Sequence, residues 1–558
     1  MNLPTPAVVS ERNARAIPRW ALLLLCAAYV LPGLFGRDPW RNADLSAFGF
    51  MASIAQGHAP WHDPAIAGIA AEGGLLPYWL GALFIKLLPF LDAPLAARLP
   101  FGLALAAVLA LVWYSTLHLA RTEAAQPVAF AFGGEAQAVD YARALADGAL
   151  LALIASLGLL RLGHETTPEI LQLLGVALFV YALAATPFRH WQARVALLLS
   201  LPMLASSGAP AVALALGVAG LWQSRQSNYT QAQALMPWLL AAMALAALAA
   251  WPLHGWAWRV HMDARSPLDW LSLVGWFCWP AWPLAAWSLW RWRGHLQRRH
   301  IAVPLLVSLV PLLCSLLMDA NDRALMLALP PLAVLASFAL PTFQRSASAA
   351  IDWFSVFFFS AGALFLWAYY CALQLGWPAK LLSNVRRLAQ GYQPEFGLLS
   401  FVLALMGSLA WIWLVRWRTA RHRDALWKSL VLPAGGVALA WLLAMTLGLH
   451  PLNYARSNKP LVERVAVHLP ADVDCIAAPG LPLHVLAALE FQGGWRVDGR
   501  SPLTQSHCSH ALVNLEEGLQ ARAPWSVTAL LRRPTDRVGG YALLQRRQDS
   551  KIGRASCR

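Results

Sequence analysis

Apolar runs of roughly twenty residues recur along most of the chain and are separated by short polar segments. Because a helix needs ~20 apolar residues to cross the hydrocarbon core of a bilayer, each run predicts a transmembrane helix. We expect about thirteen of them. The runs are 20–35, 97–120, 143–161, 170–187, 193–206, 210–224, 233–252, 269–290, 301–318, 324–343, 353–376, 397–415 and 429–448.

Basic residues gather in every second loop between these runs. They lie at Arg12 to Arg19, at 291–299 and at 416–428. Since Lys and Arg are retained on the cytoplasmic side, the pattern places the N-terminus in the cytoplasm. We expect a multi-pass protein of a bacterial inner (plasma) membrane. The segment 121–142 is polar and small, and a hidden span there would invert every later loop against the charge pattern.

Three regions depart from the apolar pattern. Residues 37–96 are mixed and predict an external, periplasmic loop with interfacial amphipathic helices. The stretch 377–396 likewise predicts an external amphipathic segment. Residues 451–550 are polar, and strand-like pieces at 473–477 and 541–544 predict a small α/β periplasmic domain. The fold class is therefore an all-α polytopic membrane domain, 1–450, followed by this C-terminal domain.

Two further features lie in the C-terminal part. Cys475 and Cys508 are the only cysteines outside the predicted spans apart from Cys557. On the oxidising side of a membrane such a pair can form a disulfide, and two buried free thiols are the alternative. Residues 551–558 read like a translated sequencing adapter, so they are excluded from the interpretation.

Composition supports the membrane class and excludes another. Only 13% of the residues are charged, against about 25% in soluble domains. The 28 Trp suit the headgroup zone, where amphipathic rings are favoured. The net charge of +15 resides mostly in short loops, so it indicates orientation in a membrane. Membrane lipids are therefore expected partners, and nucleic acid is not.

Ionisable residues are rare in the middle of the apolar runs, which argues against a transport pathway. The chain also lacks a phosphate-binding glycine loop, a nucleophile elbow and a metal-binding histidine helix. Carboxylates gather instead in the predicted external loops, where they suit chemistry on a lipid-linked substrate. One can act as a general base, and nearby cations can hold a leaving phosphate. These acidic residues are Asp38, Asp44, Glu72, Glu165, Glu169, Asp319 and Asp322.

Motifs in the first loop carry a family resemblance. The loop reads Gly-Arg-Asp-Pro-Trp-Arg-Asn-Ala-Asp-Leu-Ser over 36–46, Glu-Gly-Gly-Leu-Leu-Pro-Tyr-Trp over 72–79 and Ala-Ala-Arg-Leu-Pro over 96–100. In this order they resemble the GT-C superfamily of membrane glycosyltransferases. The nearest branch is that of the bacterial aminoarabinose lipid A transferases and protein O-mannosyltransferases. Later pieces agree: 206–210 lies at the family's Lys-Gly-Pro break and 329–333 resembles its Leu-Pro-Pro-Leu-Ala segment.

The chain departs from the family at three points. The family's Asp-Glu pair is Asp44-Leu45, its Lys-Pro-Pro is 73–75, and the lysine of its Lys-Gly-Pro is Ser207. These losses leave open the identities of the donor and the acceptor, and a catalytically inactive membrane scaffold is one alternative. A flippase or transporter of lipid-linked sugar is another, favoured by the span count and by the helix break at 206–210.

The resemblance implies an inverting glycosyltransferase whose donor is a polyprenyl-phosphate-linked sugar. The acceptor would be a glycolipid such as lipid A, or a protein, on the periplasmic face. Asp44 is then the candidate catalytic carboxylate, although an Asp there also suits a helix N-cap. Asp38 and Glu72 are the other catalytic candidates. The candidate substrate-binding residues are Arg37, Arg41, His164, Glu165, Asp322 and Arg323.

A metal ion is not expected. His58 and His62 could ligate a divalent ion together with Glu72, but two interfacial histidines are weak evidence for such a site. No cofactor besides the lipid-linked donor is required by the motifs.

Overall fold

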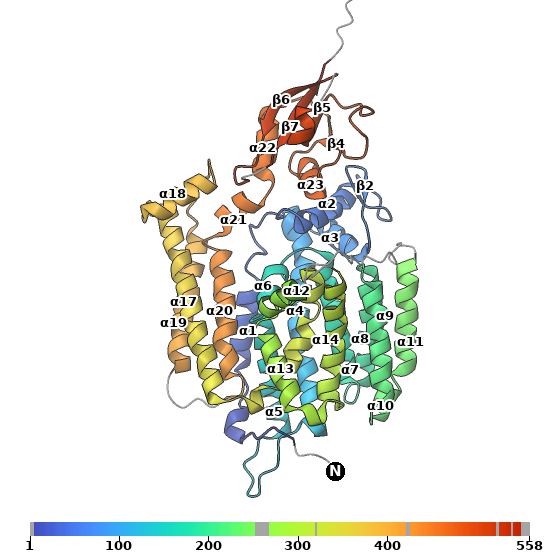
Figure 1. Cartoon of the computed structure of the whole chain (residues 1–558), viewed down its shortest axis with the longest axis vertical. Helices are drawn as coiled ribbons and strands as arrows, with labels where there is room; N and C mark the ends of the chain where they lie inside the picture. The colour runs from blue at the N-terminus through green and yellow to red at the C-terminus, as the bar shows by residue number, and fades with distance from the viewer. Residues whose placement is uncertain are drawn as a thin grey trace, which may run out of the picture.

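A bundle of helices carries a small sheet domain at one end, and the first described residues of the chain, with the short 3-10 helix η1 (Glu11–Ala14), lie at the opposite end (Figure 1). The computed structural model describes residues 5–251, 267–318, 321–419, 425–520, 524–536 and 539–547. Asp319 and the adapter-like tail 551–558 lie outside these ranges.

Every predicted apolar run contains at least one helix of the bundle. The first half of the bundle consists of α1 (Arg19–Val30), α4 (Ala93–Ala120), α5 (Ala138–Ile154), α6 (Leu157–Leu162), α7 (Pro168–Ala185), α8 (His190–Ser206), α9 (Pro210–Arg225), α10 (Thr230–Gln233) and α11 (Met236–Ala250). The second half consists of α12 (Pro267–Phe277), α13 (Ala281–Arg291), α14 (Arg299–Leu317), α15 (Asp322–Met326), α16 (Leu329–Ser337), α17 (Arg345–Leu375), α19 (Leu398–Thr419) and α20 (Lys428–Ala444).

The bundle is that of a multi-span membrane protein. Within the described ranges, six helices are long and apolar enough to cross a bilayer, or seven if α20 and the bent α21 (Leu449–Arg456) count as one span. Several other bundle helices are shorter: α5 and α8 have 17 residues each, and α12 and α13 have 11 each. The predicted class, a multi-span membrane protein, is confirmed. The predicted count of thirteen spans stays a prediction.

The segment between α4 and α5 contains no further span. Its described residues hold only the short 3-10 helix η2 (Glu123–Ala125). The segment pairs with the N-terminal residues through a bridge between Ser10 and Glu135 and a hydrogen bond from Val128 N to Ala7 O of 2.9 Å. It lies at the N-terminal end of the bundle (Figure 1).

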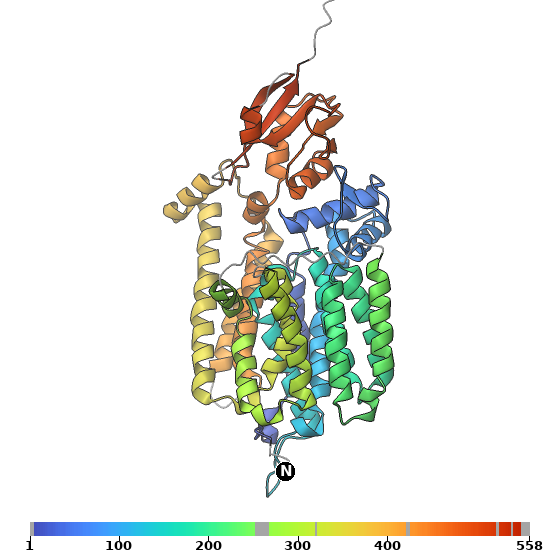
Figure 2. The ribbon, with the colours of Figure 1, turned by 45° about the vertical axis from the view of Figure 1, so that its right-hand side comes forward.

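The first loop forms α2 (Ala43–Gln56), the hairpin β1 (Ala65–Ile66) and β2 (Ile69–Ala70), and α3 (Leu76–Leu87). It lies between the bundle and the C-terminal domain (Figures 1 and 2). Phe48 contacts Phe491 edge to face at 4.7 Å, and Ala67 N donates to Glu490 at 2.9 Å. The loop is therefore part of one continuous core with the C-terminal domain.

The C-terminal domain contains a five-stranded mixed sheet with the order β4-β3-β5-β7-β6. Its elements are α22 (Lys459–Val467), β3 (Cys475–Ala477), α23 (Leu483–Phe491), β4 (Arg496–Asp498), β5 (His510–Asn514), α24 (Leu515–Leu519), β6 (Trp525–Leu531) and β7 (Tyr541–Arg546). The strands β3, β4 and β5 are parallel, whereas β7 runs antiparallel to β5 and β6. Cys475 and Cys508 are joined by a disulfide beside this sheet.

The helix pair α17 and α19 stands at the side of the bundle, with α18 (Ala379–Leu388) at its end nearer the C-terminal domain (Figure 2). The amphipathic stretch predicted over 377–396 therefore contains a helix in its first half. Its charges, among them Lys380 and Arg386, lie on a helix that presents only Val385 to the interior.

Candidate functional site

A carboxylate is buried at the start of α2. Asp44 is 3% exposed. Its Oδ1 accepts hydrogen bonds from Thr166 N and Thr166 Oγ1, both at 2.8 Å. Its Oδ2 accepts one from Trp40 N at 3.1 Å and lies 3.5 Å from Arg37 Nη2. Because an acidic side chain in the first turn also complements the helix dipole, this position stabilises the ionised form.

The turn that presents Asp44 is strained. Asn42 directly precedes α2 and has φ 72° and ψ −133°, a backbone conformation that is costly for any residue other than glycine. Hydrogen bonds hold the turn closed: Leu45 N donates to Trp40 O at 2.8 Å and Arg41 N donates to Arg456 O at 2.8 Å. Strain of this kind persists only where the surroundings impose it, so the position of Asp44 is fixed by its neighbours.

Two buried arginines lie beside this carboxylate. Arg37 is 3% exposed and Arg98 is 2% exposed. Arg37 Nη2 donates to His164 O at 2.6 Å, and its guanidinium lies 4.9 Å over the Trp40 ring. Arg98, in the first turns of α4, donates to Arg37 O. A buried charge is tolerated only when it is paired and hydrogen-bonded, and Asp44 supplies the counter-charge for both arginines.

The turn between α6 and α7 and the first turn of α7 bring two more carboxylates to the same place. Glu165 Oε2 lies 2.6 Å from Arg323 Nη2, and Glu169 Oε2 lies 3.2 Å from Arg323 Nη1. Arg323 Nη1 also donates to Thr167 Oγ1 at 3.1 Å. We call Arg37, Asp44, Arg98, Glu165, Glu169 and Arg323 the carboxylate–arginine cluster.

A local cap places Arg323 in this cluster. Asn321 is the N-cap of α15, and its side chain accepts hydrogen bonds from Arg323 N and Ala324 N at 2.9 and 3.1 Å. The neighbouring Asp322 forms an ion pair with Arg161 of α6 at 3.3 Å. Three segments that are far apart in sequence are thus tied together at the end of the bundle that faces the C-terminal domain (Figure 1).

The environment separates the acidities of the two central carboxylates. Burial alone would raise the pKa of Asp44, but Arg37, Arg98 and the two hydrogen bonds from Thr166 lower it below its ordinary value. For Glu165, burial raises the pKa, and the Asp44 charge adds to this effect against the opposing charge of Arg323. Neighbouring carboxylates whose pKa values are pushed apart are suited to different roles, one permanently ionised and one able to exchange a proton.

His164 anchors the turn to the bundle. Its Nε2 lies 2.9 Å from Tyr29 O, to which it donates, and its ring stacks on Trp441 with centroids 4.2 Å apart. Burial lowers the pKa of His164 to about 4, and the Arg37 charge adds to this against the hydrogen bond to Tyr29. The imidazole is therefore neutral at physiological pH and holds its own carbonyl in place for Arg37.

The other predicted residues lie around the cluster. Arg41 forms an ion pair with Asp536 of the C-terminal domain at 3.2 Å. Asp38 N donates to Asn453 Oδ1 at 3.2 Å, and Asp38 borders a cavity described below. Glu72 is exposed just before α3, a short distance along the chain from the close packing of Gly74 on the break at 206–208. The structure thus gathers Asp44, Arg37, His164, Glu165, Asp322 and Arg323, and places Arg41, Asp38 and Glu72 at the edges.

A group of positive charges lies next to the cluster. The guanidinium of Arg456, at the end of α21, lies 5.2 Å over the Trp40 ring, on which Arg37 also stacks. Arg41, Arg161 and Arg37 all repel the charge of Arg456. Among the described residues Arg456 has no ion-pair partner, so this group can accept an anion.

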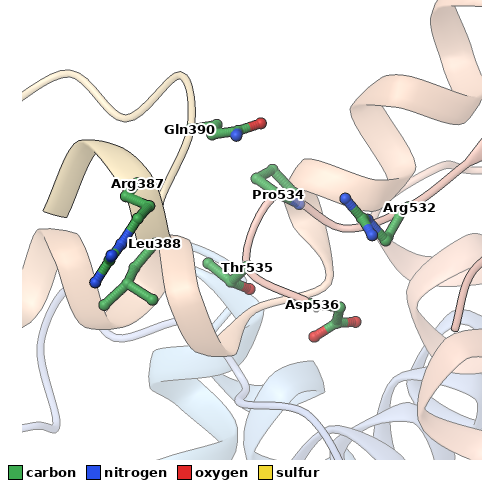
Figure 3. Close-up of a pocket in the computed structure, with 7 residues that line it drawn as sticks. All are labelled: Arg387, Leu388, Gln390, Arg532, Pro534, Thr535 and Asp536. Atoms are coloured by element: carbon green, nitrogen blue, oxygen red, sulfur yellow. The ribbon is translucent and has the colours of Figure 1, made fainter. Parts of the chain in front are cut away.

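A cavity of about 470 Å³ opens farther out, between the end of α18 and the loop 532–536 (Figure 3). Arg387 and Arg532 lie on opposite sides of Thr535 in this view. Asp536, at its lower edge, is held by Arg533 at 3.2 Å as well as by Arg41. The cavity is therefore linked to the first loop through Asp536.

Sequence reasoning missed several residues of the site. Arg98 could have been found, because a charged residue that opens a long apolar run is expensive unless it has a specific partner. Thr166 and Trp40 gave no signal, since one is a small polar residue in a turn and the other is one of 28 Trp. Arg456 lies just beyond the last apolar run, where a basic residue is ordinary.

Comparisons with known proteins bear on the fold. No protein-family model and no curated protein matches the chain. The crystal structure of ArnT from Cupriavidus metallidurans bound to undecaprenyl phosphate matches with a TM-score of 0.61 and 14% identity, over 94% of this chain and 96% of that one. The same protein in the apo state matches with a TM-score of 0.59 and 12% identity over the same shares.

The chain has the fold of ArnT. The resemblance to GT-C transferases that the motifs predicted is confirmed at the level of the fold. The match covers the bundle, the first loop and the C-terminal domain together, because it extends over nearly the whole of both chains.

Proposed function

We propose that this protein is an inverting membrane glycosyltransferase that uses a polyprenyl-phosphate-linked sugar as its donor. The observation that carries the proposal is the carboxylate–arginine cluster, in which the buried Asp44 joins the first loop to the turn after α6. The ArnT fold supports it, since ArnT was crystallised with undecaprenyl phosphate. The acceptor is a glycolipid of the lipid A type or a protein.

The two central carboxylates divide the chemistry. Asp44 stays ionised and holds Arg37 and the 164–167 turn in place, so that it orients the acceptor nucleophile. Glu165, whose pKa burial raises, is the better group to take a proton from an acceptor hydroxyl or phosphate. Its Oε2 is held by Arg323, and this contact positions the carboxylate.

The leaving polyprenyl phosphate is stabilised by arginines. The sequence offered Arg37, Arg41 and Arg323 as basic candidates among the substrate-binding residues. In the structure Arg37 and Arg323 are engaged with carboxylates, whereas Arg456 is free of ion pairs among the described residues. Arg456 is therefore the proposed phosphate ligand. Arg161 and Arg41, which is itself paired with Asp536, contribute positive charge beside it.

We also propose a topology and a domain division for the chain. Residues 1–450 form a catalytic domain with thirteen spans in an inner membrane, and 451–550 form a periplasmic domain. The N-terminus is cytoplasmic, and the first loop 37–96 and the cluster face the periplasm. The disposition of the ends supports this arrangement, because the basic N-terminal segment and the C-terminal domain lie at opposite ends of the bundle.

The test is mass spectrometry of polyprenyl-phosphate sugars in cells that lack the gene, complemented with wild type or variants. We expect a donor that accumulates in the deletion strain, clears with wild type and persists with Asp44→Asn or Glu165→Gln. Asp140→Asn is the matched control, because Asp140 forms an exposed ion pair with Arg143 at the start of α5. This variant should clear the donor.

The alternatives give different outcomes. Clearance by both Asp44→Asn and Glu165→Gln would remove these residues from the mechanism. A donor pool that is unchanged by deletion would reject the transferase and favour an inactive scaffold. Movement of labelled donor across proteoliposomes without sugar transfer would favour a flippase.

A further inference from the structure

A second cavity of about 340 Å³ lies where the first loop meets the C-terminal domain. Asp38 and Pro39 line it from the first loop, Pro94 from the start of α4, and α22 and the segment after α23 from the C-terminal domain. Its volume is within the range of small-ligand sites, roughly 300–1,000 Å³. Asp38 is adjacent in sequence to Arg37, so the cavity borders the carboxylate–arginine cluster.

The cavity has a polar side formed by one face of a helix. Lys459 and Glu463 are four residues apart on α22, so their side chains lie on the same face of the helix. Asp38 faces the same cavity from the first loop. Two carboxylates and one ammonium make this side rich in hydrogen-bonding groups and slightly negative, which disfavours a phosphate as the ligand.

The other side of the cavity presents an aromatic ring and an amide. Trp495 is partly exposed and lies against Gly493, where a Cβ would come within 2.3 Å of the Trp495 ring. Gln492 donates through Nε2 to Ser457 Oγ at 3.4 Å, while its buried Oε1 accepts no hydrogen bond among the described residues. A buried acceptor without a partner is costly unless a ligand supplies a donor.

We infer that this cavity binds a sugar ring. A pyranose has one face of C–H groups that can pack on an aromatic ring, and its hydroxyls can donate to carboxylates and to an amide oxygen. Trp495 supplies the ring, Asp38 and Glu463 accept from the hydroxyls, and Gln492 Oε1 gains the donor that it lacks. That the sugar is the glycan part of the acceptor rests on the function proposed above, whereas the ligand class follows from the cavity alone.

The cavity is lined by Val462, Ala466 and Phe491 as well as by the charged Lys459 and Glu463 of α22, and these charges suit the hydroxyls of a sugar better than an acyl chain. The lipid part of a glycolipid acceptor would therefore remain in the membrane while its sugar enters this site. The C-terminal domain then takes part in acceptor recognition through α22 and the segment 492–495.

Saturation-transfer difference NMR on the full-length protein in lipid nanodiscs tests the site without sugar-based detergent. The probes are glucose, glucosamine and N-acetylglucosamine at millimolar concentration. We expect ring-proton signals for at least one probe with wild type, and a loss of about fivefold or more in Trp495→Ala and Glu463→Gln. Trp377→Ala is the control, because Trp377 is 74% exposed and lies outside the cavity, and it should keep the signal.

Gly493→Ala provides a second variant, because its Cβ would press on the Trp495 ring at 2.3 Å and on Leu489 O at 2.7 Å, and it should also weaken the signal. A melting temperature near that of wild type would show that each variant folds. The inference is overturned if no probe gives a signal with wild type, or if folded Trp495→Ala and Gly493→Ala both keep it. Sugar binding without any sugar transfer would support the binding site and reject the transferase function. Sugar transfer without binding in this cavity would support the transferase function and reject the binding site.

Discussion

At the scale of single residues, the site depends on how completely Asp44 is hydrogen-bonded. Thr166 alone supplies two of its bonds, one from the backbone and one from the hydroxyl. A hydrogen bond to a charged group contributes about 1.5–3 kcal/mol, more than a neutral one. The sequence could identify Asp44 as a candidate, but a turn threonine 122 positions away has no pattern that reveals it as a partner.

Replacing the Thr166 hydroxyl should therefore affect both stability and chemistry. We expect Thr166→Val to lower the free energy of unfolding by about 2 kcal/mol and to raise the pKa of Asp44, because one bond to its charged form is lost. The sugar-transfer rate should then fall off at higher pH than in wild type. Measuring unfolding and the pH–rate profile checks this.

Thr186→Val is a matched control for that variant. Thr186 is equally buried at the end of α7, but its hydroxyl donates to Ala182 O at 2.6 Å and not to a carboxylate. Its pH–rate profile should match that of wild type. An unshifted profile in Thr166→Val would show that this hydroxyl does not tune Asp44.

The lowered pKa of His164 should make the stability of the protein depend on pH. Its ordinary pKa of 6.5 is lowered to about 4 by burial, so between these values the unfolded state binds a proton that the folded state does not. The contribution of neutral His164 to the free energy of unfolding is therefore fully present above pH 6.5. It is lost as the pH falls toward 4, by up to about 3 kcal/mol.

Thermal unfolding over this pH range tests the effect. His164→Phe keeps a ring against Trp441 but cannot titrate, so its unfolding midpoint should depend less on pH between 6.5 and 4. His62→Phe, at an exposed position in the first loop, should keep the wild-type slope. Equal slopes in wild type and His164→Phe would contradict a buried neutral His164.

At the scale of elements, the helices were more predictable than their breaks. Long apolar runs specify where helices lie, and each predicted run contains one. The run 269–290 is divided into α12 and α13, and 324–343 into α15 and α16. Prolines at 280, 330 and 331 mark these places, because proline removes a helical hydrogen bond. Hydropathy alone does not show such breaks, since the residues around them remain apolar.

Close packing between two distant motifs could not be read from the sequence. A Cβ on Gly74 would come within 2.2 Å of both Gly208 N and Ser206 O, which are backbone atoms and cannot move aside as a side chain would. We expect Gly74→Ala to destabilise the protein by about 2 kcal/mol or more. Gly275→Ala in α12 has open space and should be neutral or stabilising. Chemical denaturation of the two variants measures the difference, and equal stabilities would refute this contact.

At the scale of the whole molecule, the first loop joins the membrane bundle to the C-terminal domain. The alternation of basic loops and the change of composition after residue 450 were enough to predict two regions. They could not show that α2 packs on α23, because contacts between segments more than 400 residues apart leave no local pattern. The site and the sugar-binding cavity both lie along this contact, so their geometry depends on it.

This contact requires a glycine on α2. A Cβ on Gly49 would come within 2.6 Å of Ala487 Cβ and 2.9 Å of Ile66 Cδ1. Gly49→Ala should therefore separate α2 from α23 and increase hydrogen exchange in residues 483–491 and 65–70. Since the closest approach is to the Ala487 methyl group, adding Ala487→Gly should restore part of the protection, although the approach to Ile66 Cδ1 at 2.9 Å remains and glycine in a helix costs about 1 kcal/mol.

The double variant decides whether domain docking positions the site. If it recovers both exchange protection and sugar transfer, the C-terminal domain acts by holding α2, and with it Asp44, in place. Recovery of protection without transfer would mean that the geometry of Asp44 is set from the membrane side, by Arg37 and the turn after α6. If Gly49→Ala changes neither property, the packing of α2 on α23 is looser than the 2.6 Å approach requires.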